Sequence, residues 1–210
     1  MKKYYLLQFS ILISFSIYGQ VSNTIPGVYS LTSVMETASA FKLNKDSTFE
    51  FYFSYGALDR YGSGKWSIVN KLIVLNSKPY PGKDFKLTDS SLTKNNFITI
   101  QIKDKNPHLY RFVYCLSKTE TGDSLLNAND SGIIILPGNQ DTINLLSELS
   151  PERVSGFIID HKKVNSYTFS FEPWALEVFF KNFTLQFVKD HLEGQHPLLN
   201  DGKYTYIKEE

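Results

Sequence analysis

Three features of this 210-residue chain predict an all-β fold. First, its 13 Tyr, 16 Phe and 2 Trp residues gather in short runs where apolar and polar residues alternate, the pattern of half-buried strands. Second, Asn, Asp, Gly and Pro separate these runs and favour turns. Third, helix signals are scarce: Ser150-Pro151 can begin a turn or two of helix, and residues 185–192 fit a strand only slightly better than a helix.

The first half of the chain is predicted to contain two hairpins, with strands at residues 40–43, 48–53, 64–69 and 72–75. In the clearest strand, Phe49, Phe51 and Phe53 share one face. The polar residues 44–47 form the first turn. Asn70-Lys71 forms the second, because Asn tolerates the positive φ that a tight turn requires.

A Pro- and Gly-rich passage at residues 77–82 marks the expected domain boundary. Alternation then resumes, and strands are expected at residues 97–102, 110–116, 132–136, 157–159, 167–171, 175–180, 183–188 and 202–207. Residues 175–180 and 183–188 flank Lys181-Asn182 as a predicted hairpin. We therefore divide the chain into a signal peptide (1–19), an N-terminal antiparallel β-meander (20–82) and a β-sandwich module (83–210).

The N-terminus has the features of a secretory signal peptide: Lys2 and Lys3, an apolar run over residues 4–18, and the small residue Gly19 at a plausible cleavage point. The run is shorter than the ~20 residues needed to cross a bilayer. No Cys follows it to accept a lipid anchor. We expect an exported chain, periplasmic or extracellular, that begins near Gln20 and carries no transmembrane segment.

The charge balance of the chain argues against a nucleic-acid-binding protein. Cleavage after residue 19 removes two of the 22 Lys+Arg residues and no acid, leaving 20 against 21 Asp+Glu, or −1. A near-neutral chain without a basic run is a poor nucleic-acid binder.

The single Cys, Cys115, lies in an apolar strand-like run and cannot form an intramolecular disulfide. We expect a buried, inert thiol.

The first half contains three short motifs: residues 27–31, residues 41–49 with the sequence FKLNKDSTF, and residues 64–68 with the sequence GKWSI. With these motifs it resembles the meander of bacterial lipocalin-like envelope domains. The resemblance covers about residues 25–76, which supply too few strands for a closed eight-stranded barrel of the kind that holds a ligand.

In the second half, residues 98–104, 129–137 and 141–145 match an opening strand, a "D-x-G-hydrophobic-x-hydrophobic-P" strand and a following strand. With these motifs the second half resembles the carboxypeptidase-regulatory-like, or transthyretin-like, β-sandwich of secreted Bacteroidetes-type proteins. In that family the domain is an accessory. The resemblance therefore implies an adhesive, docking or structural role and transfers no catalytic residue.

Common catalytic and metal motifs are absent from the sequence, which has no Gly-x-Ser-x-Gly elbow, phosphate-binding loop or dinucleotide fingerprint. His191 and His196 have acids nearby, but a spacing of five places them on different faces of a helix. Residues 127–132 match the start of a calcium loop, yet Gly138 stands where the bidentate Glu is required. We therefore predict no catalytic residue, metal or cofactor.

One candidate binding surface is the glycine-bracketed segment 54–64, which contains Tyr55, Asp59, Arg60 and Tyr61. Tyr and Arg together offer rigid stacking surface and directional hydrogen bonds. The alternative is a hairpin loop in which Arg60 pairs locally with Asp59. As an exposed binding residue, Arg60 would be replaceable by Ala with little loss of stability.

A second candidate is Glu172, Trp174 and Glu177, an aromatic residue beside two carboxylates, as on sugar-binding or glycoside-cleaving surfaces. Core packing of Trp174 is the competing interpretation. The overall expectation is a binding, docking or structural module, not an enzyme, whose partner is another envelope protein or a glycan. Two alternatives remain: a small envelope hydrolase using carboxylates of the C-terminal module, and a lipocalin-like carrier with an open cavity in residues 25–90.

Overall fold

The computed structural model describes residues 25–119 and 122–210. Within these ranges it contains sixteen β strands and one short 3₁₀ helix, which confirms the all-β class. The expected signal peptide lies outside the described residues. No helix in the described ranges is both long and apolar enough to span a bilayer.

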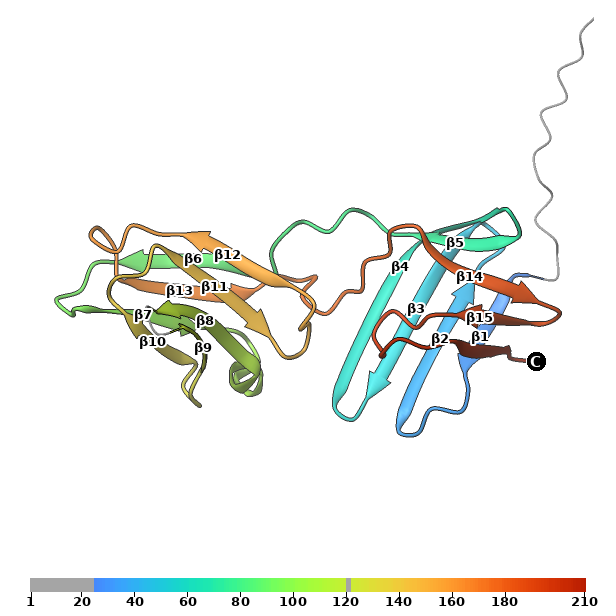
Figure 1. Ribbon diagram of the computed structural model, residues 1–210, viewed down its shortest axis with the longest axis horizontal. Helices are drawn as coiled ribbons and strands as arrows, with labels where there is room; N and C mark the ends of the chain where they lie inside the picture. The colour runs from blue at the N-terminus through green and yellow to red at the C-terminus, as the bar shows by residue number, and fades with distance from the viewer. Residues whose placement is uncertain (1–24, 120–121) are drawn as a thin grey trace, which may run out of the picture.

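Eight antiparallel strands close into a barrel in the order β1-β16-β15-β14-β5-β4-β3-β2 (Figure 1). Strands from the two ends of the chain complete it, since β1 pairs with β16 through Tyr29↔Lys208 and Leu31↔Tyr206. The barrel strands are β1 (Gly27–Leu31), β2 (Thr37–Leu43), β3 (Thr48–Tyr55), β4 (Leu58–Val69), β5 (Leu72–Asn76), β14 (Phe183–Val188), β15 (His191–Gly194) and β16 (Tyr204–Lys208).

The remaining strands form a sandwich inserted between β5 and β14 (Figure 1). One sheet has the order β10-β7-β13-β6 and the other β12-β11-β8-β9. The only parallel pairing among these named strands joins β13 to β7. The elements are β6 (Phe85–Ser91), β7 (Phe97–Ile102), η1 (Pro107–Phe112), β8 (Val113–Thr119), β9 (Gly122–Asn127), β10 (Ile133–Pro137), β11 (Thr142–Ser147), β12 (Val154–Ile158) and β13 (Ser166–Phe171).

The structure corrects the expected division of the chain. The sandwich begins close to the predicted boundary, but residues 183–208 belong to the barrel and not to a module spanning 83–210. They supply the strands that the N-terminal meander lacks for closure. Residue alternation identifies a strand but not its partner, so the sequence pattern could not show that the last three strands return to the first five.

Local turn predictions fared better than long-range pairings. Asn70 and Lys71 have φ of +50° and +67° and join β4 to β5 as expected. The predicted hairpin across Lys181-Asn182 is wrong, because residues 175–180 form no strand and β14 pairs instead with β5 and β15. Residues 185–192 are divided between β14 and β15, which meet at a turn where Lys189 has positive φ.

The structure differs from two other local predictions. Ser150-Pro151 begins a hydrogen-bonded turn and no helix, with the Arg153 N–H donating to the Ser150 carbonyl. The predicted strand at 110–116 starts only at β8, because residues 107–112 form η1, whose N-cap is Asn106. Pro107 suits this position, where no backbone donor is needed.

Aromatic side chains fill the barrel interior. Phe41, Phe49 and Phe51 are at most 2% exposed. Phe180, from the segment between sandwich and barrel, inserts among them with ring centroids 6.1, 5.2 and 5.3 Å away. The interior is therefore a packed core, contrary to the open cavity that a carrier would need.

The sandwich has a separate core of Ile, Leu, Val and Phe side chains that includes Cys115. The Cys115 side chain is fully buried, and this burial raises the pKa of its thiol to about 11. The thiol is protonated at neutral pH and is a poor nucleophile, as expected from its sequence context.

Truncating Phe180 tests the packed barrel. Phe180→Ala should lower the free energy of unfolding by about 3–5 kcal/mol, because it leaves a cavity among rings that cannot collapse to fill it. Denaturant unfolding measures the change. Ile207→Ala, at an exposed position of β16, is the matched control and should change stability by about 0.5 kcal/mol or less. Equal effects of the two substitutions would contradict a filled barrel.

Candidate functional site

Two connecting segments, residues 77–84 and 172–182, join the barrel to the sandwich (Figure 1). Three of the predicted site residues, Glu172, Trp174 and Glu177, lie on the second segment. Trp174 ties the two segments together, since its indole nitrogen donates to the Lys83 carbonyl at 2.8 Å. The indole remains partly exposed. The expected core packing of Trp174 is therefore replaced by a position at the domain junction.

Arg60 lies on the inner face of β4, not in a loop; the connection between β3 and β4 is only Gly56-Ala57. Its side chain is 1% exposed. The guanidinium forms two bonds to the Glu152 carboxylate of the sandwich, at 3.1 and 2.7 Å, and donates to the Glu177 carbonyl at 3.2 Å. The partner of Arg60 is thus across the junction, and the expected pairing with Asp59 is wrong.

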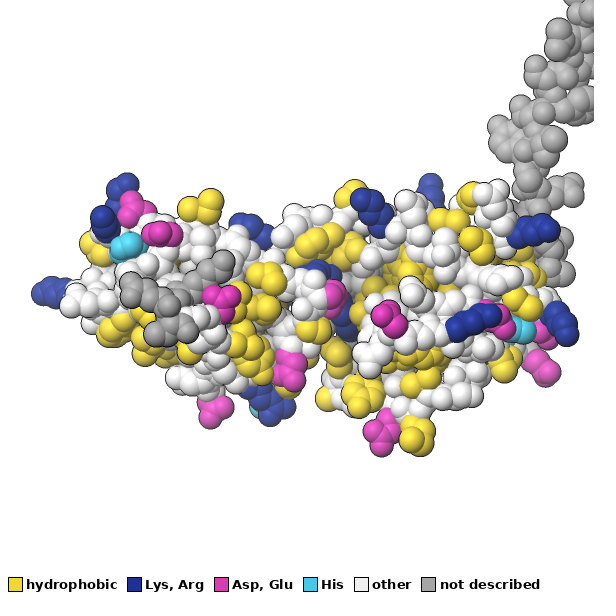
Figure 2. Space-filling view, viewed as in Figure 1, with side chains coloured by type: hydrophobic (Ala, Val, Ile, Leu, Met, Phe, Trp, Pro, Cys, Tyr) yellow, Lys and Arg dark blue, Asp and Glu magenta, His cyan; other side chains and the backbone are white. Residues whose placement is uncertain are grey.

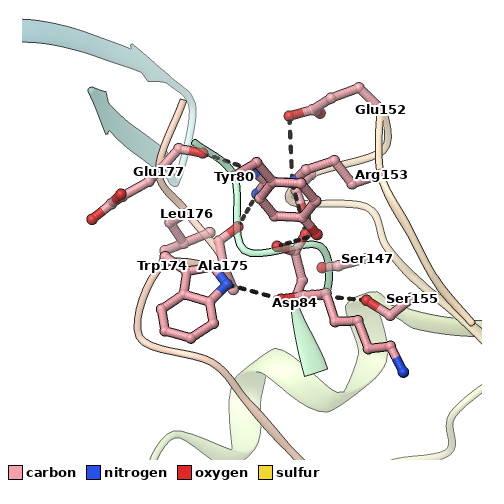
Figure 3. Close-up of polar contacts among 12 residues, drawn as sticks. Tyr80, Asp84, Ser147, Glu152, Arg153, Ser155, Trp174, Ala175, Leu176 and Glu177 are labelled. Carbon is pink, nitrogen blue, oxygen red and sulfur yellow. Dashed lines mark hydrogen bonds and ion pairs between the residues drawn. The ribbon is translucent and has the colours of Figure 1, made fainter. Parts of the chain in front are cut away.

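Arg153, directly before β12, holds the second connecting segment from the sandwich side. Its guanidinium donates to the carbonyls of Glu177 at 2.7 Å and Ala175 at 2.6 Å. Its Nε donates to the Asp84 carboxylate at 2.8 Å. The guanidinium carbon lies 5.1 Å from the centre of the Tyr80 ring, which covers it (Figure 3). The two arginines therefore share the Glu177 carbonyl.

Asp84 ends the first connecting segment and is 1% exposed. Its carboxylate accepts hydrogen bonds from Ser150 at 3.0 Å and Tyr80 at 3.1 Å, and its N–H donates to Ser155 at 2.8 Å (Figure 3). Burial raises the pKa of Asp84, and the Arg153 charge opposes that shift. A buried charge pair requires such additional hydrogen bonds to offset its desolvation.

Glu152 differs from Asp84 because its side chain is 45% exposed. Burial of the carboxylate opposes its ionisation, but hydrogen bonds and charge from Arg60 outweigh that effect and lower the pKa of Glu152. Both carboxylates thus face arginines. We name Arg60, Glu152, Arg153 and Asp84 the arginine clamp.

Tyr55, Asp59 and Tyr61 occupy the strands around Arg60. Tyr61 projects from the outer face of the barrel and is 48% exposed. Its strand neighbour is Tyr52, whose hydroxyl donates to the Asp59 carboxylate at 3.2 Å. Tyr55 ends β3 at the barrel mouth, where it lines a separate pocket with Arg60. The four predicted residues therefore divide between the outer face and the mouth.

A cleft of about 680 Å³ lies between the barrel and the sandwich. Tyr61 lines it from the barrel, Glu172 from the second connecting segment, and apolar side chains including Leu109, Leu149 and Leu176 line its walls. Figure 2 shows the surface hollowed between the two domains, with hydrophobic side chains on both sides. The cleft thus brings together one residue from each predicted candidate set.

Glu177 turns away from this arrangement. Its carboxylate pairs with Lys78 at 3.0 Å. Its backbone carbonyl accepts hydrogen bonds from both arginines of the clamp. Figure 3 shows the carboxylate directed away from Asp84. The structure therefore does not place Glu172 and Glu177 side by side in the cleft as paired carboxylates.

His191 and His196, the two histidines considered as metal ligands, lie in different surroundings. His191 lies on β15 beside Glu193 and Asp190, whose hydrogen bonds raise its pKa. His196 is buried near the barrel mouth, where its Nδ1 accepts from the N–H groups of Leu198 and Leu199 at 3.0 and 3.1 Å. Residues 25–119 and 122–210 contain no group of three or more His, Cys, Asp or Glu side chains suited to a metal.

Because Nδ1 of His196 accepts, Nε2 carries the proton and donates to Ser39 at 3.0 Å. The Ser39 hydroxyl in turn donates to the Tyr52 carbonyl at 3.0 Å. Desolvation lowers the pKa of His196 to about 4. The neutral ring is therefore a structural link between β2, β3 and the segment after β15.

Comparison with known proteins yields no assignment: no protein-family model, curated protein or solved structure matches this chain. The site is therefore defined by its geometry alone.

Sequence reasoning missed several residues that form the site. Asp84, Glu152 and Arg153 build the clamp, and Tyr52 forms a pair with Tyr61. Tyr52 could be predicted from the alternation of β3, which places it opposite the buried phenylalanines. The arginine clamp could not be predicted in this way, because Arg60, Asp84 and the Glu152-Arg153 pair are distant in sequence and meet only in the folded protein.

Arg60→Ala should destabilise the protein, in contrast to the neutral effect expected of an exposed binding residue. We expect a loss of about 2–3 kcal/mol, since the substitution removes charge-assisted hydrogen bonds and buried packing. Urea unfolding provides the measurement. Lys42→Ala is the control: it removes an exposed ion pair with Glu50 worth about 0–1 kcal/mol. If the Arg60 substitution costs no more than the control, the clamp is not stabilising.

His196 should make stability depend on pH. Its pKa is about 4 when folded against 6.5 for the ordinary side chain, so the unfolded chain binds the proton more readily. The contribution is fully present above pH 6.5 and is lost as pH falls toward 4, by about 3 kcal/mol. The readout is the unfolding free energy of wild type minus that of His196→Gln across this range. A difference that stays flat across this range would refute the assignment.

Proposed function

We propose that this protein is an exported binding module whose partner, another envelope protein or a glycan, docks in the cleft between the barrel and the sandwich. One observation carries the proposal: Tyr61 and Glu172, which belong to the two separate candidate surfaces of the sequence, both line the same cleft. Domain interfaces are preferred places for ligand sites, and the cleft volume falls in the usual range of about 300–1,000 Å³.

The arginine clamp supports this function because it fixes the two walls of the cleft. Arg60 and Arg153 join barrel, sandwich and connecting segment through charge-assisted hydrogen bonds. A cleft with fixed walls loses little conformational freedom when a partner binds. The signal-peptide pattern supports export, and the accessory role implied by the sandwich resemblance agrees with binding.

The two alternative functions receive less support. A glycoside hydrolase built on Glu172 and Glu177 would need both carboxylates in the cleft. Glu172 lines the cleft, whereas the Glu177 carboxylate pairs with Lys78 and Glu177 is not among the lining residues. A carrier would need space inside the barrel, where Phe180 and its neighbouring rings are packed.

A fragment screen tests the cleft and does not require the natural partner. We expect a library of small uncharged aromatic and aliphatic fragments to shift the amide resonances of Tyr61, Leu109 and Leu176. Leu109→Glu should abolish these shifts by placing a charge in the cleft wall. Leu125→Glu, on the exposed outer face of the sandwich, is the control and should leave them unchanged.

Fragments that gather on the outer face of the sandwich and leave the cleft empty would contradict the proposal. Turnover of a glycan panel that is lost in Glu172→Gln would favour the hydrolase alternative instead. Both measurements use the mature chain, residues 20–210.

A further inference from the structure

The outer face of the barrel carries two exposed aromatic residues, of which Tyr61 lines the cleft. Tyr52 on β3 and Tyr61 on β4 are direct strand neighbours and are 46% and 48% exposed. Side chains paired in this way across antiparallel strands lie about 5 Å apart at Cβ. We name these two neighbouring residues the Tyr52–Tyr61 platform; Tyr61 is the member that lines the cleft.

Polar groups beside the platform are prepared for hydrogen bonding. The Asp59 carboxylate accepts from the Tyr52 hydroxyl and so restricts the position of that ring. In the cleft, the polar residues Glu172, Ser147 and Ser170 are among those that form the lining. Acceptors and donors thus adjoin an apolar stacking surface.

The charges in the cleft are balanced, since the lysines Lys103 and Lys105 are matched by the acids Asp104 and Glu172. A phosphate or other polyanion calls for an excess of positive charge. Equal numbers of both signs favour an uncharged ligand instead.

Two other uncharged ligand classes fit less well. An extended peptide that adds to a sheet needs a free strand edge. On the cleft side of β4 that edge is already used: the Tyr61 carbonyl accepts from the Val178 N–H at 2.7 Å, and the Ser63 carbonyl accepts from the Ser77 hydroxyl at 2.7 Å. A lipid tail needs an enclosed apolar space, and aromatic side chains occupy the barrel interior.

We propose that the Tyr52–Tyr61 platform and the adjoining cleft bind an uncharged oligosaccharide. A sugar ring has a flat face of C–H groups that packs on an aromatic ring, whose face is electron-rich. Its hydroxyls both donate and accept, which suits mixed carboxylate, hydroxyl and ammonium groups. This inference rests on the proposed function and names the ligand class of the same site.

Calorimetry with neutral trisaccharides of glucose, mannose and N-acetylglucosamine tests the inference on the mature chain. We expect at least one of them to bind, with affinity at least tenfold weaker in Tyr61→Ala and in Tyr52→Ala. Tyr61→Trp should retain binding, because it keeps a stacking surface. Tyr114→Ala, on the outer face of the sandwich, is the matched control and should bind as the wild type does. Unchanged melting temperatures show that the variants are folded.

Failure to bind any of these sugars overturns the inference, as does binding that survives both tyrosine substitutions. Binding of a random peptide pool that depends on Tyr61, without sugar binding, also overturns it. The fragment screen separates the two proposals: fragments in the cleft without sugar binding leave the binding module standing, whereas an empty cleft removes both.

Discussion

The geometry of this molecule depends on two arginines, the buried Arg60 and the largely covered Arg153, that hold one connecting segment from opposite sides. Arg60 reaches it from the barrel and Arg153 from the sandwich, and both donate to the Glu177 carbonyl. Each arginine also holds a carboxylate of the sandwich side, Glu152 or Asp84. Loss of one partner would leave a buried charge or polar group without compensation, so the junction tolerates few relative positions of the domains.

The insertion of the sandwich strengthens this constraint. Because it enters after β5 and leaves before β14, two chain segments cross the junction instead of one. The second connecting segment is also anchored inside the barrel, because its Phe180 side chain packs in the barrel core. Gly62 of β4 makes room for it, since a Cβ there would approach the Phe180 ring and the Val178 carbonyl to 2.7 Å. Barrel packing and domain orientation are therefore coupled through one segment.

The sequence predicted what local rules control. The alternation of residues 48–53 identified β3, and Asn70-Lys71 identified the turn after β4, because both signals lie within a few residues. Segment 54–64 has the glycines and the Asp59-Arg60 pair that are typical of a loop, yet it forms the end of β3, a two-residue turn and the start of β4. In the structure Gly62 is needed for close packing, and Arg60 points inward because a carboxylate from the sandwich meets it. Barrel closure by β16 likewise depends on pairing across nearly the whole chain.

A rigid junction has a direct consequence for binding. The cleft takes Tyr61 from the barrel and Leu109 and Leu149 from the sandwich, so its shape is only as well defined as the relative position of the domains. Were the domains joined by one flexible linker, a ligand would have to order them and would bind more weakly for it. Because two connecting segments and the arginine clamp join the domains, their relative position is already fixed before a ligand binds. The stability contributed by Arg60 and the affinity of the cleft should therefore be linked, although Arg60 lies inside the barrel and outside the cleft.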